Sequence, residues 1–255
     1  MRMENKVNQQ HSNIKTALHS AAECQDENKV IELLEQGADV SARDKAGETV
    51  FHILARYDMK DLFVKCMERR SDAIRIRDNA GLAPLHTAIQ NRSINTASYI
   101  LTTSSAAQAD IRGENAVHYA VQNCPQEVVE QVCQLCPGLI HVPNGEKMTP
   151  IMLGVQLNKL DAVKTLFQYQ ADTTLTNYHG WSTLHLAIDT GHYSMVEWVV
   201  DHAHVDINQC DEEGMTPLSL LHSKSRYVLS PDFSRIDTLL LSKGAVMGCT
   251  TPGCR

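Results

Sequence analysis

Aromatic residues are scarce in this chain: phenylalanine, tryptophan and tyrosine together make up 5% of its 255 residues. Any hydrophobic core must therefore be built mostly from aliphatic side chains. Long apolar runs are missing as well, because no stretch approaches the roughly 20 residues that a membrane-spanning helix needs. The segment from Met1 to Gln10 is polar, with no apolar run behind its charges. We therefore predict neither a membrane span nor a secretory signal.

Positive charge is also in deficit, with 23 lysines and arginines against 30 aspartates and glutamates and a net charge of -7. Proteins that bind nucleic acid or anionic lipid electrostatically need a positive surface. The balance therefore disfavours nucleic-acid and membrane partners. Hydrophobic residues at 43% and charged residues at 21% are typical of a folded globular chain.

Motifs of known catalytic chemistry are missing too. The sequence contains no phosphate-binding loop, dinucleotide-binding glycine motif, nucleophile elbow or zinc-protease helix motif. We therefore predict no enzymatic activity and no cofactor.

The eight cysteines do not cluster into a compact disulfide framework. This favours reduced, mostly buried thiols in a protein of the cytoplasm or nucleus. Cys133 and Cys136 form half of a zinc or redox motif, and Cys249 and Cys254 offer two further thiols. We expect buried structural thiols, and a cysteine-based metal-binding or redox-sensing protein stays open as the alternative.

What the sequence does contain is a phrase that recurs seven times, with Thr-x-Leu-His or a close variant in each copy. The copies begin at Thr16, Thr49, Ala83, Asn115, Thr149, Ser182 and Thr216, so successive steps are 33, 34, 32, 34, 33 and 34 residues. A glycine stands two residues before the phrase in five copies, and Lys147 stands there in the fifth copy. Self-similarity at a fixed period of this size indicates a repeat architecture.

Local chemistry predicts a helix at each copy. A threonine or serine hydroxyl caps the first turn, and proline directly after it suits the first helical position. The preceding glycine permits the positive φ of a tight turn. A second apolar helix follows in each period, and one such pair cannot bury its apolar face without stacked neighbours. Asn115 begins a copy that has neither threonine nor proline, so we expect a weaker helix cap there.

The period and the Gly-x-Thr-Pro-Leu-His phrase resemble ankyrin repeats over residues 13–246, nearly the whole chain. The resemblance implies an all-α ankyrin-repeat solenoid of stacked helix-turn-helix units with β-hairpin-like turns. About seven repeats start near residues 14, 47, 81, 113, 147, 180 and 214, between a polar extension (1–12) and a tail (247–255). It also implies that the phrase histidines His19, His52, His86, His118 and His185 bond neighbouring repeats instead of a metal.

The resemblance implies a protein–protein interaction module that acts as an intracellular adaptor or inhibitor. The partner would meet the turn tips and the concave face formed by the first helices. A pathogen effector of the ankyrin type that modulates host proteins is an alternative with the same scaffold. The sequence indicates neither the partner's identity nor the oligomeric state.

Carried over by register, the partner-binding positions favour repeats five to seven, where the turn residues are unusually apolar. We expect an exposed patch centred on Trp181, because aromatic anchors dominate binding hot spots. The predicted partner-binding residues are Tyr57, Leu82, Met148, Leu157, Tyr178, His179, Trp181 and Met215, with Glu146, Glu212 and Glu213 at the same tips. Asn208 resembles the ankyrin asparagine that dioxygenases hydroxylate, and the alternative is an ordinary turn asparagine.

Overall fold

The computed structural model describes residues 15–103, 109–225 and 231–248, and these ranges are helical with no β-strand. None of the helices in these ranges is long and apolar enough to span a bilayer. The chain divides into two compact units, Met1–Cys124 (unit 1) and Pro125–Arg255 (unit 2). The predicted extension 1–12 and most of the tail, including Cys249 and Cys254, lie outside the described residues.

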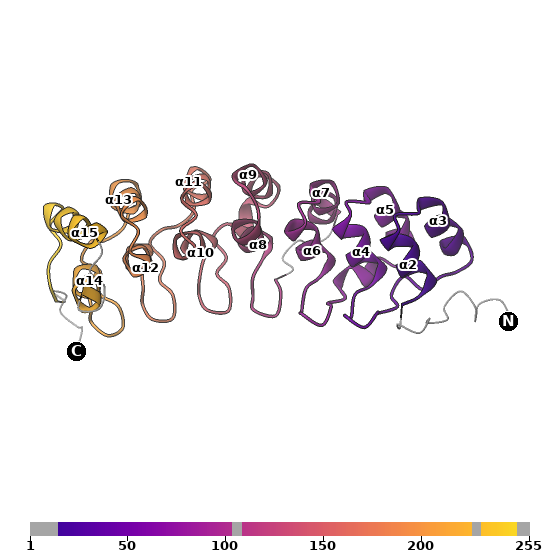
Figure 1. Cartoon of the computed structure of the whole chain (residues 1–255), viewed down its shortest axis with the longest axis horizontal. Helices are drawn as coiled ribbons and strands as arrows, with labels where there is room; N and C mark the ends of the chain where they lie inside the picture. The colour runs from indigo at the N-terminus through magenta and orange to yellow at the C-terminus, as the bar shows by residue number, and fades with distance from the viewer. Residues whose placement is uncertain (1–14, 104–108, 226–230, 249–255) are drawn as a thin grey trace. The chain divides into compact units, whose positions relative to one another are not determined.

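Unit 1 is a stack of helical pairs joined by short turns (Figure 1). Its elements are α2 (Ala17–Glu23), α3 (Glu27–Glu35), α4 (Val50–Arg56), α5 (Lys60–Arg69), the 3-10 turn η1 (Ser71–Arg75), α6 (Pro84–Gln90), α7 (Ile94–Thr103) and α8 (Ala116–Asn123). The first helices of successive pairs pack side by side, α2 on α4, α4 on α6 and α6 on α8. The second helices α3, α5 and α7 pack in a second row, which lies above the first helices in the view of Figure 1.

Unit 2 repeats the same arrangement. Its elements are α9 (Gln126–Leu135), the 3-10 turn η2 (Pro137–Leu139), α10 (Pro150–Gln156), α11 (Leu160–Gln168), α12 (Thr183–Thr190), α13 (Tyr193–His202), α14 (Pro217–Ser225) and α15 (Pro231–Ser242). Helices α10, α12 and α14 pack in sequence, and each also contacts the second helix of its own pair. The fold is therefore the all-α ankyrin-repeat solenoid that the period predicts.

Each first helix begins close to the residue at which the phrase predicts it. Thr149 accepts a hydrogen bond from Met152 N at 3.4 Å, and Ser182 accepts one from His185 N at 3.4 Å. The weak cap expected at Asn115 is wrong, because its side-chain oxygen accepts from both Val117 N (2.9 Å) and His118 N (3.3 Å). An amide oxygen caps a helix as well as a hydroxyl does.

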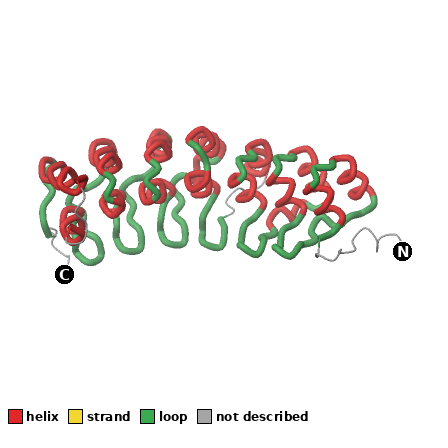
Figure 2. The backbone as a smooth tube through the Cα atoms, viewed as in Figure 1, coloured by secondary structure: helices red, strands yellow, loops and turns green. Residues whose placement is uncertain are grey.

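The turn before each first helix from α4 onward is a hairpin, drawn among the green loops of Figure 2. In the second repeat Asp44 N donates to Glu48 O at 2.9 Å, and the Asp44 carboxylate accepts from Ala46 N and Glu48 N at 2.9 Å each. The predicted positive φ is present at the glycines, for example 77° at Gly47. Lys147 takes the same left-handed conformation with φ 55°. A lysine there carries a steric cost that glycine avoids.

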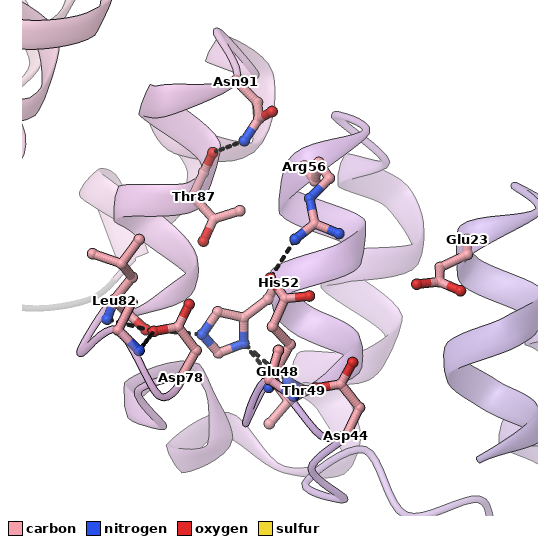
Figure 3. A network of polar contacts seen from close by, with 12 residues as sticks. Glu23, Asp44, Glu48, Thr49, His52, Arg56, Asp78, Leu82, Thr87 and Asn91 are labelled. Carbon is pink, nitrogen blue, oxygen red and sulfur yellow. Dashed lines mark hydrogen bonds and ion pairs between the residues drawn. The ribbon is translucent and has the colours of Figure 1, made fainter. Parts of the chain in front are cut away.

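The predicted histidine bonds between neighbouring repeats are confirmed where the structure resolves them. His52 accepts from Thr49 N through Nδ1 at 3.0 Å, so its Nε2 carries the proton and donates to Leu82 O of the next repeat at 3.0 Å (Figure 3). His19 contacts Glu48 O at 3.2 Å and His185 contacts Met215 O at 3.1 Å in the same way. Burial lowers the pKa of His52 and of His185, so both stay neutral.

Candidate functional site

A hollow of about 610 Å³ opens in unit 2 where the hairpin tips 144–148, 177–181 and 211–215 meet the first helices. We name it the tip hollow. Its apolar and aromatic lining is Met148, Tyr178, Trp181, Leu186, Met215 and Leu220. Its acidic lining is Glu146, Asp211, Glu212 and Glu213.

Trp181 is held in place by the next repeat. Its indole Nε1 donates to Asp211 Oδ2 at 3.1 Å, and the ring is half-buried. The other oxygen of Asp211 accepts from Glu213 N at 3.0 Å and from Met215 N at 2.8 Å. One buried carboxylate therefore shapes the tip of the seventh repeat and fixes the indole of the sixth. An aromatic side chain that is already fixed loses little entropy when a partner binds.

Tyr178 stands at the edge of the hollow and is 53% exposed. The ammonium of Lys147 lies 4.7 Å from the centre of its ring, a cation–π contact between the tips of the fifth and sixth repeats. His179, on the same tip, is exposed and its ring centre lies 6.2 Å from that of Trp181. The backbone adds a further link, since Glu212 N donates to His179 O at 3.1 Å.

Five of the eight predicted binding residues meet at the tip hollow: Met148, Tyr178, His179, Trp181 and Met215. Met148 corrects the expectation of an exposed patch, because only 3% of it is exposed and it forms part of the floor. It directly precedes the helix cap Thr149, and Asn177 Nδ2 of the next repeat donates to its sulfur at 3.7 Å.

The other three predicted residues do not line the tip hollow. Leu157 is 44% exposed and follows α10 at its C-terminal end. Tyr57, 40% exposed, and the half-buried Leu82 belong to unit 1. These residues stay predictions.

Asn208 sits in the turn between the sixth and seventh repeats, and its side chain bridges to the seventh. Its amide nitrogen donates to Gly244 O at 3.2 Å, and its oxygen accepts from Val246 N at 2.8 Å. The amide is therefore a structural link as well as a predicted hydroxylation site.

Cys133 and Cys136 are buried on and just after α9. Desolvation raises the pKa of each thiol to about 12, and Cys136 Sγ donates to Val132 O at 2.9 Å. Metal ligation and redox chemistry require the thiolate, which this environment opposes. Within the described ranges, no group of three or more histidine, cysteine or acidic residues is placed to hold a metal ion. Among the described cysteines, Cys24, Cys66, Cys133 and Cys136 carry the expected free thiols, whereas Cys210 departs from the expectation because it is disulfide-bonded.

The sequence reasoning missed Asp211 and the other acidic or amide residues that accept from their own hairpin. The series is Asp44, Asp78, Asp110, Asn144, Asn177 and Asp211, each bonded to the backbone two and four residues later. The pattern that could have revealed them was the phrase itself, because each stands five residues before a phrase copy.

Several proteins of known sequence are similar to part of the chain. Rabankyrin-5 of Mus musculus is 32% identical over 154 residues, which cover 59% of this chain and 13% of that protein. The nuclear factor NF-kappa-B p105 subunit of Gallus gallus is 21% identical over 214 residues, covering 80% of this chain and 21% of that one. The chain thus spans a small fraction of the length of these relatives.

The fold also has a close counterpart among solved structures. The ankyrin repeat domain of Bcl-3, described as a unique member of the IkappaB protein family, superposes with a TM-score of 0.68. The sequences are 19% identical, and the match covers 79% of this chain and 89% of that one.

The family assignment rests on the repeats themselves. Residues 13–45 match an ankyrin repeat, and residues 51–138, 130–211 and 151–227 match arrays of ankyrin repeats. This repeat is a scaffold for protein–protein interaction, generally without catalysis. The chain belongs to the ankyrin-repeat family.

Proposed function

We propose that this chain is an intracellular adaptor or inhibitor that binds a partner protein through the tip hollow of unit 2. The observation that carries the proposal is the convergence of three successive hairpin tips on one hollow around the fixed Trp181 ring. Aromatic residues on a preformed surface supply most of the binding energy in protein interfaces.

The lining supports binding rather than a purely structural role. Tyr178 leaves more than half of its surface in water at the edge of the hollow. Glu146, Glu212 and Glu213 are exposed around it. An apolar centre with a polar rim is the usual anatomy of a protein interface.

The test compares two tyrosine-to-alanine variants that differ in place. Tyr178→Ala removes a ring of the tip hollow, and Tyr57→Ala removes a similarly exposed ring from unit 1. Each tagged variant, checked for wild-type helicity by circular dichroism, captures partners from cell lysate for quantitative mass spectrometry.

We expect Tyr178→Ala to reduce capture of the main partner by about tenfold or more, in the range of a binding hot spot. Tyr57→Ala should retain it, because the proposal places the site in the tip hollow of unit 2 and the sequence-predicted Tyr57 lies outside that hollow. Equal retention by both variants, or loss with Tyr57→Ala alone, would contradict the placement of the site in unit 2. An adaptor will carry a second protein into the captured complex, whereas an inhibitor will suppress the partner's own binding.

A further inference from the structure

The charge of the tip hollow is one-sided. Four of its lining residues carry carboxylates, and within the described part of the chain no lysine or arginine lines it. Asp211 is committed to its hairpin and to Trp181. The carboxylates of Glu146, Glu212 and Glu213 are exposed and form no ion pair with any described residue. This edge of the hollow therefore attracts a cation.

The aromatic rings favour the same kind of ligand. Tyr178 already accepts the ammonium of Lys147 at 4.7 Å from its ring centre, which shows that a cation reaches this ring. The indole of Trp181 is the stronger cation–π acceptor of the two and is held by Asp211.

The floor suits the rest of a long basic side chain. Met215, Leu186 and Leu220 line it with thioether and aliphatic groups. Lysine and arginine bury their aliphatic stems on apolar surface while the charged head stays among polar groups. The apolar floor thus suits the aliphatic stem of a basic side chain, the aromatic rings suit its cation, and the carboxylates supply the opposite charge.

We propose that the tip hollow binds a lysine or arginine side chain carried by a basic segment of the partner protein. Its cation lies against Trp181 and between the carboxylates of Glu212, Glu213 and Glu146. The inference rests on the proposed function, since it names the chemistry that the same hollow recognises.

Because Lys147 lies beside the proposed cation site, the proposal predicts that removing its charge strengthens binding. Its ammonium occupies the face of Tyr178 and repels a second cation. Lys147→Gln therefore strengthens binding of a basic segment, whereas a substitution that merely damaged the surface would weaken it.

The experiment uses the full chain labelled with ¹⁵N and follows its two tryptophan indole resonances by NMR. Trp181 lines the hollow, and Trp198 on α13 does not, so Trp198 is the internal control. The probe is an amidated seven-residue peptide in which arginine, lysine and arginine alternate with alanine. Peptides with glutamine or glutamate at the three basic positions are the controls.

We expect the basic peptide to shift the Trp181 resonance saturably and leave Trp198 in place. Glu212→Gln with Glu213→Gln should weaken this binding at least about threefold, given what exposed charge pairs contribute. Lys147→Gln should tighten it about twofold. The matched control is Glu127→Gln with Glu130→Gln, which removes two exposed charges from α9 of the same unit and should leave binding unchanged.

Three results would overturn the inference: no saturable Trp181 shift with the basic peptide, an equal shift with the glutamine peptide, or equal losses in the two glutamate double variants. Tyr178→Ala separates this failure from that of the proposed function. If Tyr178→Ala still loses its captured partner while the basic peptide fails to bind, the hollow binds protein by another chemistry.

Discussion

The carboxylate of Asp211 both shapes its own hairpin and holds the indole of Trp181, and substitutions at Asp211 separate these two roles. Oδ1 accepts two backbone N–H groups of its hairpin, and Oδ2 accepts the indole N–H of Trp181. Asp211→Asn keeps an oxygen for the hairpin, as Asn177 does in the preceding repeat with bonds of 2.9 and 3.0 Å. It places an NH2 group against the indole donor instead. Asp211→Ala removes all three bonds.

The magnitudes follow from the bonds lost. A hydrogen bond to a charged acceptor contributes about 1.5 kcal/mol or more, and a neutral backbone bond about 1 kcal/mol. We therefore expect Asp211→Asn to lower the free energy of unfolding by about 2.5 kcal/mol, because it loses the indole bond and the charge on the acceptor of two hairpin bonds. Asp211→Ala, which loses all three bonds to the carboxylate, should lower it by about 4.5 kcal/mol. Asn177→Ala, which loses two bonds to a neutral acceptor, should cost the least, about 2 kcal/mol.

Urea unfolding followed by circular dichroism measures these differences, and the Trp181 indole resonance reports on the local bond. Equal costs for the asparagine and alanine variants would show that the hairpin itself needs the negative charge. An unchanged Trp181 resonance in Asp211→Asn would show that Oδ2 does not hold the indole. Either result would refute the division of labour between the two oxygens.

Three further predictions concern the backbone, the histidines and the thiols. Lys147→Gly relieves the left-handed φ of 55° and should raise the free energy of unfolding by about 0.5 kcal/mol. Gly180→Ala should lower the free energy of unfolding by about 2 kcal/mol or more, because the new Cβ would lie 2.8 Å from Glu212 N. Thermal melts compare the two variants. Burial lowers the pKa of His52 and of His185 in the folded protein, so below the unfolded histidine pKa near 6.5 the unfolded chain binds more protons than the folded one. The free energy of unfolding should therefore be level above that pH and fall by up to about 1.4 kcal/mol per pH unit per histidine as the pH drops. Urea titrations from pH 7.5 to 5.5 measure this slope. Burial raises the pKa of Cys133 and of Cys136 to about 12, so both thiols should react slowly with an alkylating reagent. Alkylation of the native protein at pH 8, followed by peptide mapping, should label the exposed Cys24 within minutes and leave Cys133 and Cys136 unmodified for hours. Rapid labelling of Cys133 and Cys136 would revive a redox or metal role.

The fold could be predicted from the sequence because its determinants are local and repeated. A hydroxyl that caps a helix, a proline at the first turn and a glycine with positive φ each act within a few residues. Seven copies in register then leave few alternatives to stacking. The cap at Asn115 was misjudged for a local reason as well, because its amide oxygen was not counted beside threonine and serine.

The site was predictable only in part, because exposure depends on the neighbouring repeat. Met148, Trp181 and Met215 hold the same place before the helix cap, yet Met148 is buried and the other two are half-buried. Register therefore identified which residues share a surface, but not how deep each side chain lies. The bond from Trp181 to Asp211 spans 30 residues, and no local pattern encodes it.

At the hairpin position five residues before each helix cap, aspartate and asparagine both shape the turn, but only aspartate has a second oxygen that can accept a further hydrogen bond. Asn144 and Asn177 shape their turns with one oxygen and have no second acceptor to offer. Asp110 and Asp211 use the second oxygen to fix an aromatic side chain, Asp110 through Tyr119 OH at 2.9 Å and Asp211 through the indole of Trp181 at 3.1 Å. A charged acceptor at a position that the fold already requires thus orients a ring without altering the backbone. In a solenoid whose repeats share one backbone, such a substitution is a physical route by which an aromatic ring becomes fixed at one tip while the hairpins of the neighbouring tips keep the same backbone.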